Sequence, residues 1–307
     1  MSRGLLPAIA ACWIWGFAFV GPLLLSDWPG LAVAAGRYIA YGLASLLTLA
    51  LLLKRGRARL DEPAIWRDAL LLTLSGNLLY YALLSVAVQK AGYVMPTLII
   101  GLLPVTVSLA GRLREGRGFS LRYVWALLLI LAGLWLAHMP KAGEVVAASS
   151  DDESLGIACA FGSLALWTMY GVMNGQRMRL YPGIGGLQWS SLQGTAALPF
   201  ALLLFALSTP SEPWSRPDWG LFVTVGLFLG VATSWAANAL WNRASTQLDA
   251  SLLGQMIVFE TIAGIVYGAV WTRAVPAPTV IAGTVVLVIG VIVALSERQQ
   301  AAVVPVS

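Results

Sequence analysis

Apolar stretches of membrane-spanning length recur along the whole chain, separated by short polar breaks. Each stretch is close to the roughly 20 residues that an α-helix needs to cross the hydrocarbon core of a bilayer. The breaks contain turn residues, as in Tyr181-Pro182-Gly183. The pattern predicts an all-α membrane protein with ten transmembrane helices, at about residues 4–25, 30–53, 67–88, 92–112, 121–138, 155–177, 183–207, 219–241, 250–272 and 276–295.

The composition supports this class, because 59% of the 307 residues are hydrophobic and only 11% are charged. A soluble domain carries roughly 25% charged residues, so the charges here are too few for a water-exposed surface. A single histidine, His138, excludes a multi-histidine metal site. We expect no metal and no cofactor. The sequence also lacks a Walker A loop and the hydrolase motifs H-E-x-x-H and G-x-S-x-G.

The basic residues are distributed unevenly between the two sides of the predicted membrane. With the N-terminus taken as cytoplasmic, 14 of the 19 lysines and arginines fall in cytoplasmic segments and four in external ones. This bias follows the positive-inside rule and predicts that both termini are cytoplasmic. The basic residues therefore serve as topology signals, and nucleic acid is not expected as a partner. The compact build fits a multi-pass protein of a bacterial inner membrane.

The chain also resembles itself at an offset of about 155 residues. The matching stretches are Trp15-Gly16 with Tyr170-Gly171, Leu103-Pro104-Val105 with Phe259-Glu260-Thr261, and Gly133 with Gly290. At this offset each of the first five spans matches one of the second five. Because five is odd, the matched spans cross the membrane in opposite directions. The sequence thus predicts two inverted five-helix repeats, residues 1–145 and 154–297, around a central cavity.

These features resemble those of a known family. Trp15-Gly16-Phe17, Arg37-Tyr38, Leu103-Pro104-Val105 and the basic turn Arg112–Gly118 are similar to the EamA-type branch of the drug/metabolite transporter superfamily. The interior rich in Trp and Tyr is most similar to amino-acid exporters of the YddG type. The resemblance implies an alternating-access exporter of small amphipathic metabolites, most of all amino acids including aromatic ones, and no enzyme. The implied partners are this small-molecule substrate and the lipid bilayer, and we expect a monomer.

Three predicted helices carry polar and aromatic side chains on one face near the middle of the membrane. Residues three, four or seven positions apart share a face of an α-helix. The candidate substrate-binding residues chosen in this way are Asn77, Tyr80 and Tyr81, then Trp167, Tyr170 and Asn174, and finally Trp235 and Asn238. Such faces suit a small amphipathic ligand. Their alternative role is hydrogen bonding between helices.

Two charges lie well inside the predicted spans, away from their ends, and a charged group inside a membrane is a functional hypothesis in itself. Glu260 could carry a coupling proton, hold a substrate ammonium or lock its helix through an ion pair. Arg37 could anchor its helix, pair with Glu260 or contact a substrate carboxylate. Pro104 lies in the middle of the fourth span, where the missing N–H favours a kink and a candidate hinge.

Two other functions remain open at the level of sequence. A protein of the same superfamily could instead translocate lipid-linked or other metabolites. An intramembrane enzyme would need a polar cluster at one interface, for which the acidic segment 144–153 is the candidate.

Overall fold

The computed structural model describes residues 2–56, 60–114, 120–139, 151–245 and 256–303, and these residues form helices and no β-strand. Seven of the described helical segments are long and apolar enough to cross a membrane. Three shorter apolar helices lie at Val94–Val107, Val258–Thr272 and Pro278–Ala294. The predicted class, an all-α membrane protein, is confirmed.

The helices follow the predicted spans closely. The first half of the chain forms α1 (Ser2–Gly16), η1 (Phe17–Phe19), α2 (Gly21–Leu24), α3 (Gly30–Lys54), α4 (Pro63–Thr73), η2 (Leu74–Leu79), α5 (Tyr80–Ala91), α6 (Val94–Ile100), α7 (Leu103–Arg114) and α8 (Leu121–His138). The second half forms α9 (Asp151–Leu180), α10 (Gly186–Ser208), η3 (Pro213–Ser215), α11 (Trp219–Phe228), η4 (Leu229–Ala236), α12 (Ala237–Ser245), α14 (Val258–Thr272) and α15 (Pro278–Val303). Residues 250–255 of the predicted ninth span lie outside the described residues.

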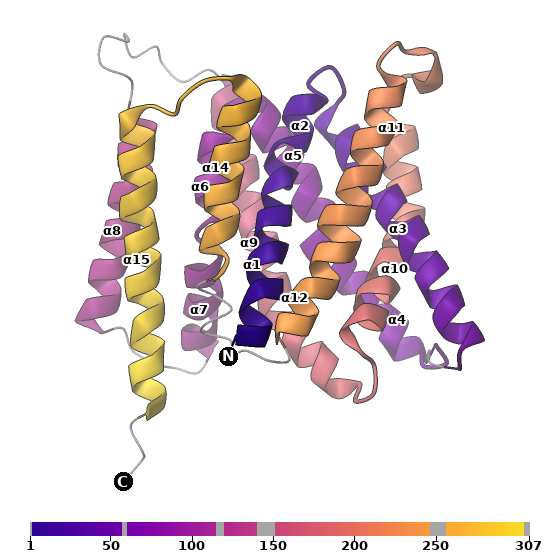
Figure 1. The fold of residues 1–307 in the computed structure, drawn as a ribbon, viewed down its shortest axis with the longest axis horizontal. Coiled ribbons are helices and arrows are strands. Elements are labelled where there is room, and N and C mark those ends of the chain that lie inside the picture. Colours follow the sequence, from indigo (N-terminus) through magenta and orange to yellow (C-terminus); the bar gives the residue numbers. More distant parts are fainter. Residues whose placement is uncertain (1, 57–59, 115–119, 140–150, 246–255, 304–307) are drawn as a thin grey trace.

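The basic side chains gather at one end of the bundle. In Figure 1, α1 begins at the end where α15 finishes, and α3, α9 and α12 also finish there. The positive residues at these helix ends and at the starts of α4 and α8 are Lys54, Arg67, Arg122, Arg177 and Arg243. We call this the basic end. The two ends of the bundle thus differ in charge as the sequence pattern indicates.

Several spans are interrupted midway. A 3-10 turn, η1, follows α1, and two segments, η2 and η4, have the wider π-helical turn. Leu74 and Leu229, the first residues of the two π segments, are 155 positions apart, which is the offset at which the sequence resembles itself. The non-helical turns at Gly101–Leu102 and at Ile257 differ by the same offset. Irregular backbone within a membrane is tolerated where protein surrounds it, and it often marks a functional site.

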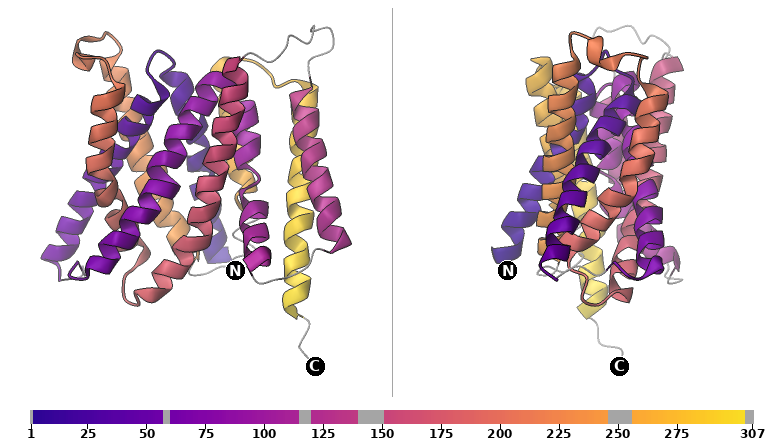
Figure 2. Two further views of the ribbon diagram at one scale, coloured as in Figure 1. Left: turned by 180° about the vertical axis from the view of Figure 1, so that it is seen from behind. Right: turned by 90° about the vertical axis from the view of Figure 1, so that its right-hand side faces the viewer.

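The largest helix interfaces join the first half of the chain to the second. The pairs are α3 with α10, α8 with α15, α5 with α9, and α1 with α12 and α14. Figures 1 and 2 show α8 and α15 side by side at one edge of the bundle. The two predicted repeats are therefore interlocked, and neither buries its helices by itself.

Small residues allow this close packing. At Gly230 of η4, an added Cβ atom would lie 2.5 Å from the carbonyl oxygen of Arg37 and 2.7 Å from the amide nitrogen of Tyr41. At Gly16, it would lie 2.5 Å from the Cβ atom of Ala263 on α14. Because backbone atoms cannot swing aside as a flexible side chain can, each of these contacts requires glycine.

Gly230→Ala should therefore destabilise the bundle. We expect overpacking against α3 to lower the free energy of unfolding by about 1–3 kcal/mol. The measurement is thermal unfolding of the purified protein in detergent. Gly220→Ala in the first turn of α11 is the matched control, because nothing lies within 4 Å of its Cβ position. Equal melting temperatures for Gly230→Ala and the wild type would contradict this interpretation of the interface.

Candidate functional site

The residues predicted on the third span are buried, and two of them reach different parts of the bundle. Asn77 lies in the π segment η2, while Tyr80 and Tyr81 begin α5, and all three are buried. Asn77 donates a hydrogen bond to Gln193 of α10, whereas the Tyr81 hydroxyl donates to the carbonyl of Ala18 in η1. The prediction assumed α-helical spacing. Asn77 itself lies in the π segment, and the two side chains bond to different helical elements.

Asn77, Tyr170 and Asn174 belong to one hydrogen-bonded network. The Oε1 atom of Gln193 accepts from Asn77 Nδ2 at 3.1 Å and from the Tyr170 hydroxyl at 3.4 Å. The Oδ1 atom of Asn174 accepts from Gln193 Nε2 at 3.2 Å and from Trp189 Nε1 at 2.8 Å. The network thus joins η2, α9 and α10. It gives these residues the hydrogen-bonding role that was the alternative to substrate contact.

Gln193 and Trp189 are members of this network that the sequence analysis missed. Both are buried on α10, with Gln193 2% exposed. Gln188, Trp189 and Gln193 lie at i, i+1 and i+5, which is not an obvious single-face pattern. The available signal was the presence of two glutamines within an otherwise apolar span, because a buried amide needs hydrogen-bond partners.

The remaining predicted residues surround the same region. Trp167 of α9 is half-buried and contacts Tyr170, with ring centroids 5.7 Å apart. Trp235 of η4 is half-buried and donates a hydrogen bond to the hydroxyl of Thr48 on α3 at 3.0 Å. Asn238 of α12 is half-buried and lies beside Tyr41. Both π segments therefore direct polar groups toward the helices around α3.

Arg37 is buried on α3 and contacts residues of two other elements, η4 and α5. Its Nε atom donates to the Ser234 hydroxyl of η4 at 2.8 Å. Its guanidinium carbon lies 4.0 Å from the centroid of the Tyr81 ring and 5.4 Å from that of Tyr38. The Nη1 atom is buried without a hydrogen-bond partner. A stacked arginine with one free donor can bind an anionic group.

Glu260 lies in the first turn of α14 and is 7% exposed. Within the described part of the chain, no hydrogen bond or ion pair engages its carboxylate. Its charge acts on Arg37, on Cys12 of α1 and on Tyr80 of α5. Arg37 and Glu260 therefore belong to one interior region, but the ion pair that was one alternative for them is not formed among the described residues. Arg37 is instead held by Ser234 and the Tyr81 ring.

Pro104 lies one position after the start of α7, beyond the turn at Gly101–Leu102 that separates α6 from α7. Proline suits the first turn of a helix, since its missing N–H would have no helical partner there. The interruption thus falls just before the proline. Whether this place moves during function remains a prediction.

A second polar cluster closes the interior at the basic end. Asp68 of α4 is 1% exposed, and its carboxylate accepts hydrogen bonds from Arg67 and Arg177 at 3.2 Å and from the Tyr181 hydroxyl at 2.7 Å. The sequence analysis did not single out Asp68, which is the second residue of the predicted span 67–88. The cluster links α4 to α9, and therefore the first half of the chain to the second.

A third cluster lies at the opposite end. Trp28 donates to the Asp218 carboxylate at 2.6 Å, and Arg216 donates to the same carboxylate at 2.9 Å. The Arg216 guanidinium also lies over the Trp28 ring, 4.6 Å from its centroid. Its hydrogen bonds lower the pKa of the Asp218 carboxyl, so acidification weakens this contact only below the ordinary range of an aspartate. This cluster also joins the two halves.

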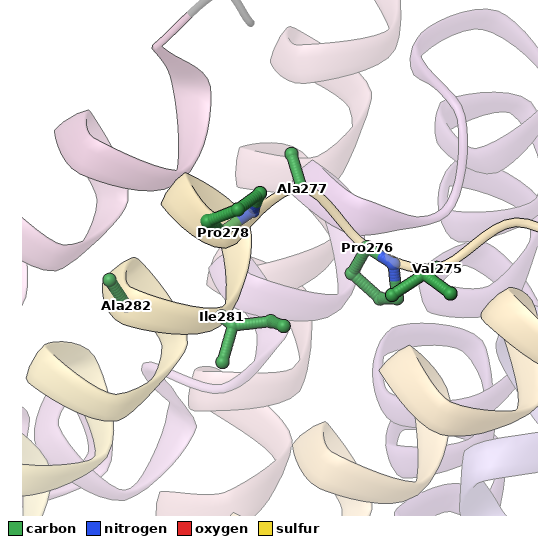
Figure 3. A pocket seen from close by; sticks show the side chains of 6 residues that line it. All are labelled: Val275, Pro276, Ala277, Pro278, Ile281 and Ala282. Carbon is green, nitrogen blue, oxygen red and sulfur yellow. The ribbon is translucent and has the colours of Figure 1, made fainter.

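Figure 3 shows an apolar pocket of about 640 Å³ at the connection between α14 and α15. Its lining consists of Val275, Pro276, Ala277, Pro278, Ile281 and Ala282. No predicted binding residue lines it, and its chemistry differs from that of the polar interior. An apolar pocket at the edge of a membrane bundle suits an acyl chain better than a zwitterion.

Comparisons with known proteins bear on the family. The EamA-like transporter family matches residues 2–139. "Inner membrane protein YtfF" of Escherichia coli (strain K12) is 33% identical over 321 residues, covering 98% of this chain and 97% of that protein. A solved crystal structure at 20% identity covers 98% of this chain and 99% of its own, with a TM-score of 0.66, and supports the fold alone. The matches point to a membrane transporter rather than an enzyme.

Asp68→Asn should test the cluster at the basic end. Loss of the charge weakens the hydrogen bonds from Arg177 and Tyr181, and we expect the free energy of unfolding to fall by about 1–3 kcal/mol. Thermal unfolding in detergent measures the change. The control is Asp61→Asn, because Asp61 is exposed before the start of α4. If both variants melt at the wild-type temperature, the cluster contributes nothing to stability.

Proposed function

Since the chain belongs to the EamA-like transporter family, we propose that it exports small amphipathic metabolites, most of all amino acids including aromatic ones. Transport is secondary or facilitative and proceeds by alternating access. The membrane is the bacterial inner membrane, as the name of the Escherichia coli relative suggests. The basic end faces the cytoplasm under the positive-inside rule, which makes both termini cytoplasmic.

The observation that carries this proposal is the set of interrupted helices around a polar and aromatic interior. The two π segments and the turns at Gly101–Leu102 and Ile257 lie in corresponding positions of the two halves. Discontinuous helices that meet near the middle of the membrane form the substrate site in many secondary transporters. Here they surround Arg37, Glu260 and several Tyr and Trp side chains.

We propose a ten-span arrangement of two inverted repeats, with residues 1–145 as the first and 154–297 as the second. The recurrence of interruptions at 155 positions supports it. So does the pattern of helix pairs, since α1 with α12 and α9 with α5 are equivalent under an exchange of halves. We expect the substrate to contact Tyr80, Tyr81, Trp167 and Trp235, with Asn77, Tyr170, Asn174 and Asn238 close to it.

The clusters at the two ends provide contacts that would break and re-form in turn during alternating access. Opening toward the cytoplasm requires the Asp68 cluster to separate, and opening to the other side requires the Trp28–Asp218 contact to break. The interlocked helix pairs argue against rocking of the two repeats as rigid units, because that motion would disrupt the largest interfaces. Helices from both halves would move together, with the turn before Pro104 as a hinge.

One observation favours a second function, the translocation of lipid-linked metabolites. The apolar pocket at residues 275–282 could hold an acyl chain at the edge of the bundle. Under this alternative, a fluorescent lipid would be translocated in vesicles while amino acids would not be. The acidic segment proposed for an enzyme lies mostly outside the described residues, and no observation favours catalysis.

Flux in proteoliposomes tests the proposed function. Vesicles that contain the purified protein are loaded with labelled phenylalanine, threonine or methionine, and their release is followed. We expect faster release than from protein-free vesicles for at least one amino acid. Trp167→Ala should slow this flux by about tenfold, the effect of losing about 1.4 kcal/mol of substrate or transition-state interaction.

Trp135→Ala is the matched control for Trp167→Ala. Trp135 is 66% exposed on α8, where it faces outward, so its loss should leave flux unchanged. No acceleration for any amino acid would overturn the substrate class, and equal flux for the two variants would remove Trp167 from the site.

A further inference from the structure

The interior holds two buried groups of opposite charge that are not paired with each other. Arg37 is 5% exposed and Glu260 is 7% exposed. Each lies within a membrane-spanning part of the chain, where water cannot replace a missing partner. A buried charge without a partner is strongly unfavourable. The described residues leave the Nη1 atom of Arg37 without an acceptor and show no hydrogen-bond donor to the Glu260 carboxylate.

The position of Arg37 is fixed in a way that leaves one donor available. Ser234 holds Nε, and the Tyr81 ring lies against the guanidinium plane. These contacts orient the group and leave Nη1 without an acceptor. Tyr81 is itself held by its hydrogen bond to Ala18. An oriented guanidinium with a free N–H is suited to a carboxylate.

Glu260 is the complementary group. No described residue donates a hydrogen bond to its carboxylate, although α1 and α5 lie close to it. The Tyr81 ring that lies against Arg37 is bonded through its hydroxyl to Ala18 of η1, and η1 packs against α14, which carries Glu260. The two charged residues therefore border one interior region. A cation in this region would satisfy Glu260 without displacing Arg37 from Ser234.

We propose that Arg37 and Glu260 together form a binding site for a zwitterion. Arg37 Nη1 donates to the carboxylate of the ligand, and Glu260 accepts from its ammonium group. The ligand class is the α-amino acid with both charged groups free, and Tyr80 and Tyr81 lie alongside it. This inference rests on the proposed function for its role in transport, but the binding site can be tested separately.

Ligand-induced thermal stabilisation of the purified protein tests binding without transport. The probes are phenylalanine, phenylalaninamide, which lacks the carboxylate, and N-acetylphenylalanine, which lacks the ammonium group. We expect phenylalanine to bind at least about tenfold more tightly than either derivative, corresponding to about 1.4 kcal/mol. Equal affinities for all three would overturn the zwitterion site, even if phenylalanine were transported.

Two variants assign the charges. Glu260→Gln should abolish the preference for phenylalanine over N-acetylphenylalanine and keep the preference over phenylalaninamide. Arg37→Gln should abolish the preference for phenylalanine over phenylalaninamide and keep the preference over N-acetylphenylalanine. If Arg37 and Glu260 had a purely structural role, each substitution would lower the affinity for all three ligands equally, and that result would overturn the assignment. If Glu260→Gln does not fold, Glu260→Asp keeps the charge and should weaken phenylalanine more than N-acetylphenylalanine.

Asp152→Asn is the control, because Asp152 is exposed and pairs with Lys90 away from the interior. Its ligand preferences should equal those of the wild type. Selective binding of phenylalanine without any flux would support the zwitterion site and overturn the proposed transport. Amino-acid flux without selective binding among the three probes would support the proposed transport and overturn the zwitterion site.

Discussion

Every backbone amide and carbonyl inside a bilayer must find its hydrogen-bond partner within the protein, and this constraint governs where the helices can be irregular. The interruptions at η1, η2 and η4 all pack against other helices, although Leu79 of η2 and Val231 of η4 are exposed. Their freed groups become partners for side chains, as when the carbonyl of Ala18 accepts from the Tyr81 hydroxyl. The same irregularities bring polar side chains from several helices to one interior region. Regular helices would leave the chain simpler to pack but less able to hold a polar ligand.

The sequence predicts the membrane class and the positions of the seven described helices that are long enough to cross a membrane, because both depend on local composition. A stretch of some 20 apolar residues has few alternatives in a bilayer. Its interior geometry depends on neighbours instead. Spacing alone could not show that Asn77 reaches α10 while Tyr81 reaches η1, since a π turn has no simple signature in composition.

The sequence indicates which polar residues are candidates for the site, but it does not indicate which residues they contact. The sequence singles out Arg37 and Glu260, since charge is rare within the spans. It does not indicate that Arg37 binds Ser234 rather than Glu260, because that choice depends on how η4 approaches α3. Asp68 was not among the candidates. It is buried because α9 packs against α4, a contact between the two halves that local sequence does not indicate.

The interlocked pairs of helices also have a consequence for biosynthesis. The ribosome completes α3 long before α10, and α8 long before α15, although these are the most extensive contacts in the bundle. The early helices are therefore inserted before their partner helices exist. In this intermediate, polar groups such as Asp68 are not yet buried and face lipid or an insertion factor. Contacts between residues far apart in sequence form slowly. We expect assembly to be completed only after the last span has emerged, so that a chain truncated midway would be recognised by cellular quality control.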